Sequence, residues 1–137
     1  MPMNNNRLIL FDLIIILICF TVLSWPASEA IAIQFGNPGG IARAYLLAWQ
    51  SGDYATMYTM LSVNSKQFIS RGEFIDNHRD FARQYIIERY SIIETIDQGQ
   101  TSEIYYELTL TGIDRPSKYL KGKLDLVLIN DRWSIDY

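Results

Sequence analysis

Two short amphipathic helices joined by a glycine–aspartate turn constrain the fold of this chain more than any other feature. The segment Ile41–Ser62 reads IARAYLLAWQSGDYATMYTMLS. Its apolar residues recur at helical spacing on both sides of the turn: Ile41, Tyr45, Ala48 and Trp49, then Tyr54, Met57, Tyr58 and Leu61. Gly52 is expected to end the first helix, because that position often needs a positive φ, and Asp53 is expected to cap the second. The segment therefore predicts a sharp helix–turn–helix.

Capping residues predict where the first and third helices begin. Asn37 followed by Pro38 is typical of a cap with proline at the first helical position. The sequence Ser70-Arg-Gly-Glu73 is a capping box that opens a third helix. The apolar side of that helix consists of Phe74, Ile75, His78, Phe81, Ala82 and Tyr85.

After the third helix the spacing of apolar residues changes to strict alternation, which is typical of strands. Tyr85–Ile96 is rich in isoleucine and tyrosine, and Glu103–Thr111 and Tyr119–Ile129 alternate apolar and polar residues. Asn130-Asp131 predicts a tight turn into a final strand. Three helices followed by about four antiparallel strands predict an α+β fold, in which the apolar face of a curved sheet packs on the helices.

The N-terminus predicts export. Arg7 precedes Leu8–Trp25, a run of 18 residues that is apolar except for Asp12, Thr21 and Ser24. A positive residue before such a run keeps the N-terminus in the cytoplasm and places the rest outside. The run is long enough to span a bilayer, but small residues before Ala30 and Ala32 also fit signal-peptidase cleavage. Both hypotheses stay open: a domain anchored to the cytoplasmic membrane, or a secreted one.

These patterns divide the chain into three parts: residues 1–32 as membrane anchor or signal peptide, 33–40 as linker and 41–137 as the folded domain. The only cysteine, Cys19, lies in the first part, so no disulfide or cysteine nucleophile is expected in the domain. A single histidine and the lack of a cysteine in the domain argue against a metal site, and no cofactor is predicted. The net charge of −3 and the lack of clustered Lys and Arg argue against nucleic-acid binding.

Five short motifs occur in a recognisable order along the helices and strands. An alanine-rich helix ends in Trp49 and is followed by Gly52-Asp53 and the pair Met57-Tyr58. Ser70–Phe74 has the form S-x-x-x-F, and Trp133–Asp136 has the form W-x-[IV]-D. This set resembles the nuclear-transport-factor-two-like N-terminal domain of penicillin-binding transpeptidases, the non-catalytic domain of the staphylococcal methicillin-resistance type.

The resemblance covers about Pro38–Tyr137 and implies a cone-shaped domain that does no chemistry itself. Family members continue into a transpeptidase domain whose nucleophile lies in S-x-x-K; no S-x-x-K occurs here, and we expect the chain to end at Tyr137. We therefore expect a spacer or protein-docking module at the bacterial cell envelope rather than an enzyme. A cell-wall transpeptidase or the antibiotic response is its implied context, with a cell-envelope protein or a second copy, paired through the sheet, as partner.

Binding of a small apolar ligand inside the cone is the alternative to a filled cone that acts as spacer. The residues predicted to line such a pocket are Tyr45, Trp49, Tyr58, Phe74, His78 and Phe81. A cavity on the order of 300 Å³ or more would favour ligand binding. His78, the single histidine, is expected to be a hydrogen-bonded residue at the edge of the core, with a general base as the other interpretation.

An isomerase-like enzyme is a further alternative, because ketosteroid isomerases share this fold and use an aspartate base with a tyrosine-containing oxyanion hole. Tyr45, Tyr58 and Tyr85 with Asp80 are the residues that such a mechanism would use. Asp76 and Asp80, however, lie four apart on the expected polar face of their helix. We therefore expect these carboxylates to be solvated.

Overall fold

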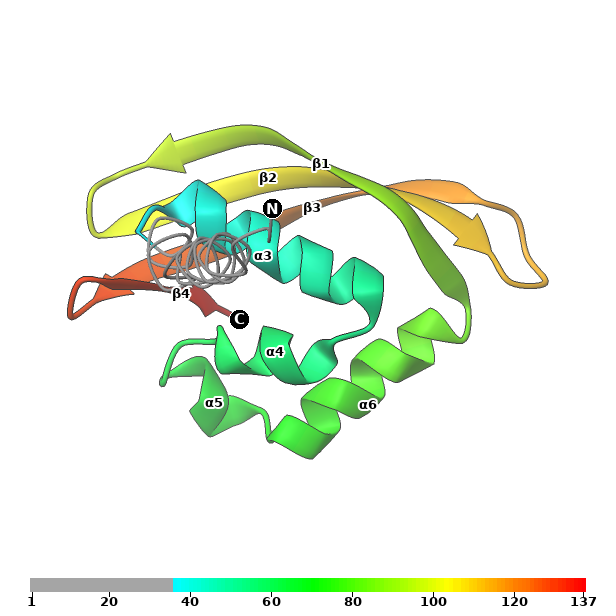
Figure 1. Ribbon diagram of the computed structural model, residues 1–137, viewed down its shortest axis with the longest axis horizontal. Coiled ribbons are helices and arrows are strands. Elements are labelled where there is room, and N and C mark those ends of the chain that lie inside the picture. The colour runs from blue at the N-terminus through cyan, green and yellow to red at the C-terminus, as the bar shows by residue number, and fades with distance from the viewer. Residues whose placement is uncertain (1–35) are drawn as a thin grey trace, which may run out of the picture. The chain divides into compact units, whose positions relative to one another are not determined.

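Four helices precede a four-stranded sheet in residues 36–137, which are the residues that the structure describes (Figure 1). In this computed structural model the elements are α3 (Pro38–Ser51), α4 (Tyr54–Thr59), α5 (Ser65–Phe68), α6 (Arg71–Ala82), β1 (Tyr85–Asp97), β2 (Thr101–Gly112), β3 (Lys118–Ile129) and β4 (Arg132–Asp136). The predicted membrane anchor or signal peptide at 1–32, with Cys19, lies outside the described residues. No helix among those described is long and apolar enough to cross a membrane.

The turn between α3 and α4 has the geometry that its residues predict. The Asn37 side chain accepts a hydrogen bond from the Gly40 amide at 2.7 Å, so α3 begins at Pro38, within the range 33–40 expected as linker. Gly52 ends α3 with a φ of 77°. The Asp53 carboxylate then caps α4 by accepting from the Thr56 amide at 3.0 Å. The predicted caps at Asn37 and Asp53 are both confirmed.

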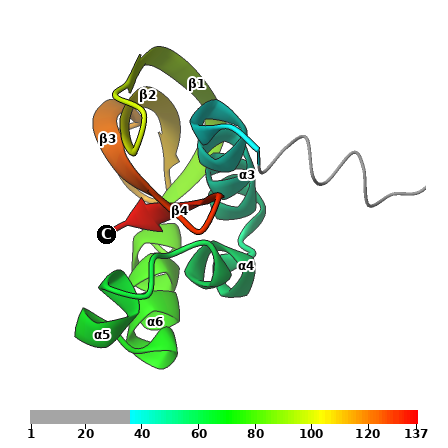
Figure 2. The same cartoon turned by 90° about the vertical axis from the view of Figure 1, so that its left-hand side faces the viewer.

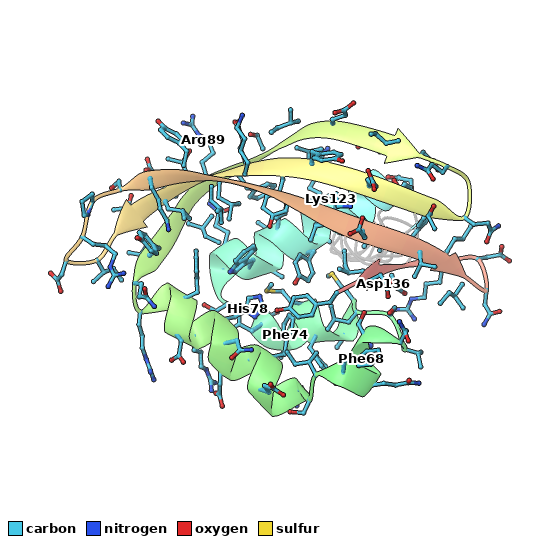
Figure 3. The ribbon with its side chains drawn as sticks, turned by 180° about the vertical axis from the view of Figure 1, so that it is seen from behind. Phe68, Phe74, His78, Arg89, Lys123 and Asp136 are labelled. Carbon is cyan, nitrogen blue, oxygen red and sulfur yellow. The ribbon has the colours of Figure 1, made fainter. Side chains whose placement is uncertain are left out.

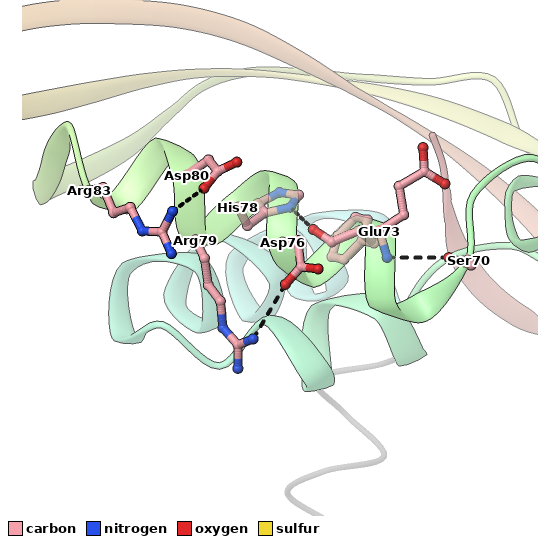
Figure 4. Close-up of polar contacts among 8 residues, drawn as sticks. Ser70, Glu73, Asp76, His78, Arg79, Asp80 and Arg83 are labelled. Carbon is pink, nitrogen blue, oxygen red and sulfur yellow. Dashed lines mark hydrogen bonds and ion pairs between the residues drawn. The ribbon is translucent and has the colours of Figure 1, made fainter.

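The third predicted helix is α6, and a short helix that the sequence did not predict precedes it. Ser70 caps α6 by accepting from the Glu73 amide at 3.2 Å (Figure 4). Helix α6 ends at Ala82, so Tyr85, expected on its apolar side, belongs to β1 instead. Helix α5 has four residues, a single turn, which is too short to show a helical spacing of apolar residues.

The four strands form one antiparallel sheet in sequence order, β1-β2-β3-β4. On β2 alternate residues are buried, and Ile104, Leu108 and Leu110 face the helices as the alternation predicts. On the other face Lys121 and Lys123 of β3 contact glutamates of β2, each at 3.1 Å. Asn130 and Asp131 have φ angles of 50° and 59°, as a tight hairpin turn requires.

The apolar core lies between the inner face of the sheet and helices α3, α4 and α6. Figures 1 and 2 show the curved sheet over α3, with α4, α5 and α6 on the far side of that helix from β1. The largest fully buried side chains include Tyr45, Leu46, Met57 and Phe74. This arrangement confirms the predicted α+β fold, an open antiparallel sheet with helices packed on one face.

Candidate functional site

A cavity of about 400 Å³ opens between the helices and the sheet. Helix α3 contributes two aromatic residues to its lining, and α6 contributes Asn77, His78 and Phe81. The remaining lining residues come from β2, β3 and the C-terminal segment that contains β4. Its lining consists of Tyr45, Trp49, Asn77, His78, Phe81, Tyr106, Lys123, Leu124, Asp125, Ile135, Asp136 and Tyr137. The volume lies within the usual range of small-molecule pockets, about 300–1,000 Å³.

Two tyrosine hydroxyls at the inner end of this cavity have no hydrogen-bond partner among the described residues. Tyr45 and Tyr106 are only 2% and 7% exposed. Among residues 36–137, no group is hydrogen-bonded to either hydroxyl. In the same residues, every side-chain oxygen or nitrogen that is sealed from solvent has a hydrogen-bond partner, so these two hydroxyls are not sealed. The hydroxyls therefore reach open space, and the cavity is the open space that both residues line.

Burial keeps these phenols protonated. It raises the pKa of Tyr45 far above its ordinary value, and the nearby Tyr137 and Tyr106 hydroxyls add to the rise. The pKa of Tyr106 is raised as well, first by burial and then by Tyr137. Tyr45 and Tyr106 therefore present hydrogen-bond donors to the cavity at neutral pH.

His78 presents an acceptor to the same space. Its Nδ1 lies 2.8 Å from the carbonyl oxygen of Phe74, which can only accept, so Nδ1 carries a proton. Burial lowers the pKa of His78, although the bond to Phe74 acts in the opposite direction. The imidazole is therefore neutral at pH 7, and its Nε2 is an acceptor without a partner among the described residues.

Aromatic contacts fix the orientation of the His78 ring. Its centroid lies 4.2 Å from that of Phe74 and 5.4 Å from that of Trp49, with the Trp49 ring edge-on. Tyr54 adds a third contact at 5.7 Å. Figure 3 shows His78 and Phe74 side by side, pointing from α6 toward the space beneath the sheet.

Two charged residues of β3, Lys123 and Asp125, also line the cavity, and their side chains pair with each other and with Glu103 of β2. Lys123 Nζ is 2.7 Å from an Asp125 oxygen and 3.1 Å from a Glu103 oxygen. These carboxylates raise the pKa of Lys123, and the lysine lowers that of Glu103. The inner end, formed by Tyr45, Tyr106 and neighbouring apolar residues, has no charged side chain among the lining residues.

Sequence comparison identifies the family. The family model described as the NTF2-like N-terminal transpeptidase domain matches residues 37–137. The chain belongs to this family. The match confirms the resemblance that the ordered motifs indicate, and it includes every residue that lines the cavity.

Solved structures with the same fold are distant in sequence. A SEC-C motif containing protein from Rhodopseudomonas palustris superposes with a TM-score of 0.64 at 10% identity, over 74% of this chain and 77% of that one. A Campylobacter jejuni protein named as an NTF2-like transpeptidase gives a TM-score of 0.55 at 14% identity, over 74% of this chain and 98% of that one. No curated protein matches the chain in sequence. These structures support the fold and nothing beyond it.

Two residues of the W-x-[IV]-D motif of this NTF2-like domain, Ile135 and Asp136, line the cavity. The Asp136 carboxylate accepts from the Ser62 and Ser65 hydroxyls at 2.8 and 3.2 Å, and both serines are 1% exposed. The Ser62 amide donates to the Ile135 carbonyl at 2.7 Å, and the Tyr137 amide donates to Ser65 Oγ at 2.7 Å. The end of β4 is thus fastened to the segment between α4 and α5.

The structure places four of the six predicted pocket residues on the cavity: Tyr45, Trp49, His78 and Phe81. Tyr58 and Phe74 do not line it. The Tyr58 hydroxyl donates to the Ile69 carbonyl at 3.2 Å, and Phe74 is fully buried beneath His78. Ligand binding by these residues stays a prediction.

The sequence reasoning missed the strand residues of the site. Tyr106 and Leu124 lie on the apolar faces that the alternation of β2 and β3 predicts, so their direction could be found from the sequence. Which helix they face could not. The sequence indicates Asp136 only as part of a motif, because its serine partners lie more than 70 positions earlier in the chain.

The residues proposed for an isomerase mechanism do not come together. Asp80 is exposed and pairs with Arg83 at 2.8 Å (Figure 4), as expected for a solvated carboxylate. Tyr85 lies beneath Lys118, whose Nζ is 4.3 Å from the ring centroid, and Tyr58 is bonded elsewhere. Only Tyr45 of that set lines the cavity, so this assignment of roles is wrong. No group of three potential metal ligands occurs among residues 36–137.

Proposed function

We propose that this NTF2-like domain is a non-catalytic module that docks on a cell-wall transpeptidase at the cell envelope. The observation that carries the proposal is the family match over residues 37–137, because the family is that of domains that accompany transpeptidases. A role in the antibiotic response would follow from such a partner and not from chemistry of the domain itself.

Export and membrane attachment belong to the same proposal. The apolar run Leu8–Trp25 behind Arg7 supports them. Sequencing the N-terminus of the mature protein from a membrane fraction tests this part. An intact N-terminus in the membrane is expected for an anchor, and a new N-terminus after Ala30 or Ala32 for a secreted domain. A full-length chain found only in the cytoplasm would contradict export.

Photo-crosslinking in living cells tests the docking role. A photoreactive amino acid is placed at single exposed positions on different elements: Val63 and Phe68 near α5, Ile93 on β1 and Tyr119 on β3. At least one position should give an irradiation-dependent adduct that mass spectrometry identifies as a transpeptidase. Since the positions sample the α5 region and two strands of the sheet, adducts with unrelated proteins alone, or none at all, would contradict docking. Unirradiated cells serve as the control.

Small-molecule binding in the cone is a second candidate function, and the cavity favours it. The spacer hypothesis expects a filled cone, whereas the structure has a cavity of about 400 Å³, above the volume on the order of 300 Å³ that separates the two hypotheses. The two functions are compatible, because the cavity and the exposed positions above are different parts of the domain.

A further inference from the structure

The inner end of the cavity combines apolar walls with polar atoms that lack partners. Three side chains supply those atoms: the hydroxyls of Tyr45 and Tyr106 and Nε2 of His78. Each residue is more than nine-tenths buried, and each lines the cavity. Because these atoms reach the open space of the cavity, a molecule bound there can form hydrogen bonds with them, each worth on the order of 1 kcal/mol.

We propose that the inner end of this cavity binds a neutral aromatic molecule that carries a hydroxyl group. A hydroxyl both accepts, as the tyrosine donors require, and donates, as His78 Nε2 requires. The proposal rests on the second candidate function, binding in the cone, and names the chemical class of its ligand.

The walls favour a flat aromatic body. Trp49 and Phe81 lie side by side on one wall, with ring centroids 5.5 Å apart, and the Tyr106 ring is edge-on to Trp49 at 6.5 Å. Leu124 and Ile135 contribute aliphatic surface from the sheet. Aromatic rings pack well in edge-on and tilted contacts of this kind. A cavity of about 400 Å³ accommodates one or two fused rings.

The electrostatics favour a neutral ligand over an anion. The tyrosines at the inner end resist ionisation because the site is poorly solvated, and a ligand carboxylate there would face the same cost. Lys123 does not offset that cost, since Asp125 and Glu103 already neutralise it.

Because His78 is the only histidine in the chain, it provides a direct readout. Full-length protein in lipid nanodiscs is labelled with ring-¹⁵N histidine, so that the Nε2 resonance reports on this one site. The titrated probes are 2-naphthol, naphthalene without the hydroxyl, and the anion 2-naphthoate. We expect 2-naphthol to shift Nε2 the most and to bind about fivefold more tightly than naphthalene, the gain of one hydrogen bond.

Tyr45→Phe tests the hydroxyl contact, since it removes one oxygen and keeps the ring. It should weaken 2-naphthol binding about fivefold and leave naphthalene binding unchanged. Tyr119→Phe is the matched control, because Tyr119 is 77% exposed and does not line the cavity; it should change neither affinity.

Three results would overturn the proposal: an Nε2 resonance that 2-naphthol leaves unmoved up to its solubility, tighter binding of 2-naphthoate, or equal affinity for 2-naphthol and naphthalene. The last result would leave binding in the cone intact and remove only the recognition of a hydroxyl. Docking on a transpeptidase is tested separately by crosslinking, so failure of either proposal is distinguishable from failure of the other.

Discussion

Asp136 accepts hydrogen bonds from two serine hydroxyls that are almost completely buried. The two hydroxyls also lie 2.9 Å from each other, and either of them can be the donor of that bond. Ser62 Oγ accepts from the Ser65 amide at 3.0 Å and Ser65 Oγ from the Tyr137 amide, so the carboxylate, the two hydroxyls and two backbone amides form one hydrogen-bonded cluster. One side chain thereby holds the end of β4 against the helices and helps to form the cavity wall.

Replacing Asp136 by alanine should destabilise the domain by about 2 kcal/mol, because two buried hydroxyls lose their acceptor. Asp136→Asn should cost less, since its amide oxygen still accepts. Urea denaturation of the full chain measures both. The control is Asp76→Ala, whose exposed carboxylate pairs with Arg79 at 3.4 Å and should contribute little. Equal effects of Asp136→Ala and Asp76→Ala would contradict the role of the serine contacts.

His78 should make the stability of the domain depend on pH. Burial lowers its pKa below the ordinary value of 6.5, so below about pH 6.5 the unfolded chain binds a proton that the folded domain resists. The stability is therefore complete above pH 6.5 and falls as the pH drops toward the lowered pKa. The charged groups of the same cavity, Lys123, Asp125 and Asp136, have no bond to the imidazole.

The check on this prediction is chemical denaturation of the wild type and His78→Gln between pH 7.5 and 5. The stability difference between the two proteins should shrink as the pH falls, because only the wild type has the titrating imidazole. A difference that is constant over this range, or that grows in favour of the wild type at low pH, would show that the pKa is not lowered.

Strands β2 and β3 fit together through a glycine. Gly122 pairs directly with Tyr106, and a Cβ atom at position 122 would collide with the Tyr106 ring and hydroxyl. The missing side chain is what lets the phenol lie flat across β3 and reach the cavity. This pairing connects the register of the sheet to the shape of the candidate site.

Gly122→Ala should destabilise the domain by about 1–3 kcal/mol, because the Tyr106 ring must move. In the Tyr106→Ala background, Gly122→Ala should cost much less. Thermal or urea denaturation of the wild type, the two single variants and the double variant measures this coupling. Gly72→Ala is the control: its Cβ would meet nothing within 4 Å in α6, so it should stabilise by about 0.5–1 kcal/mol. Additive effects of the Gly122 and Tyr106 substitutions would contradict the proposed clash.

The elements themselves could be predicted from the sequence where local rules decide them. The caps at Asn37, Asp53 and Ser70 and the alternation of β2 follow from hydrogen bonding and spacing within a few residues. Helix α5 could not be predicted, because one turn has no period. The contacts that build the site depend on register and on long-range approach: Tyr106 with Gly122, and Asp136 with serines from the other end of the domain.

At the scale of the whole domain, the helices and the sheet enclose a cavity of about 400 Å³ that both polar and apolar residues line. The family match explains the fold and the motifs. The cavity needs a separate explanation, because a spacer has no use for an open cavity of about 400 Å³ lined by tyrosine hydroxyls and an imidazole. A homodimer paired through the sheet stays a prediction. The outer face of the sheet, which such a dimer would bury, carries the ion pairs of Lys121 and Lys123.

Labelling with fluorescent penicillin tests the central claim, a non-catalytic domain docked on a transpeptidase, most directly. Cells with the photoreactive residue are irradiated, and their membranes are treated with the label, which acylates the serine nucleophile of transpeptidases. The account predicts label on the crosslinked adduct and none on the free chain. Label on the free chain would show that it has transpeptidase chemistry of its own, and unlabelled adducts at every position would show that its partner is not a transpeptidase.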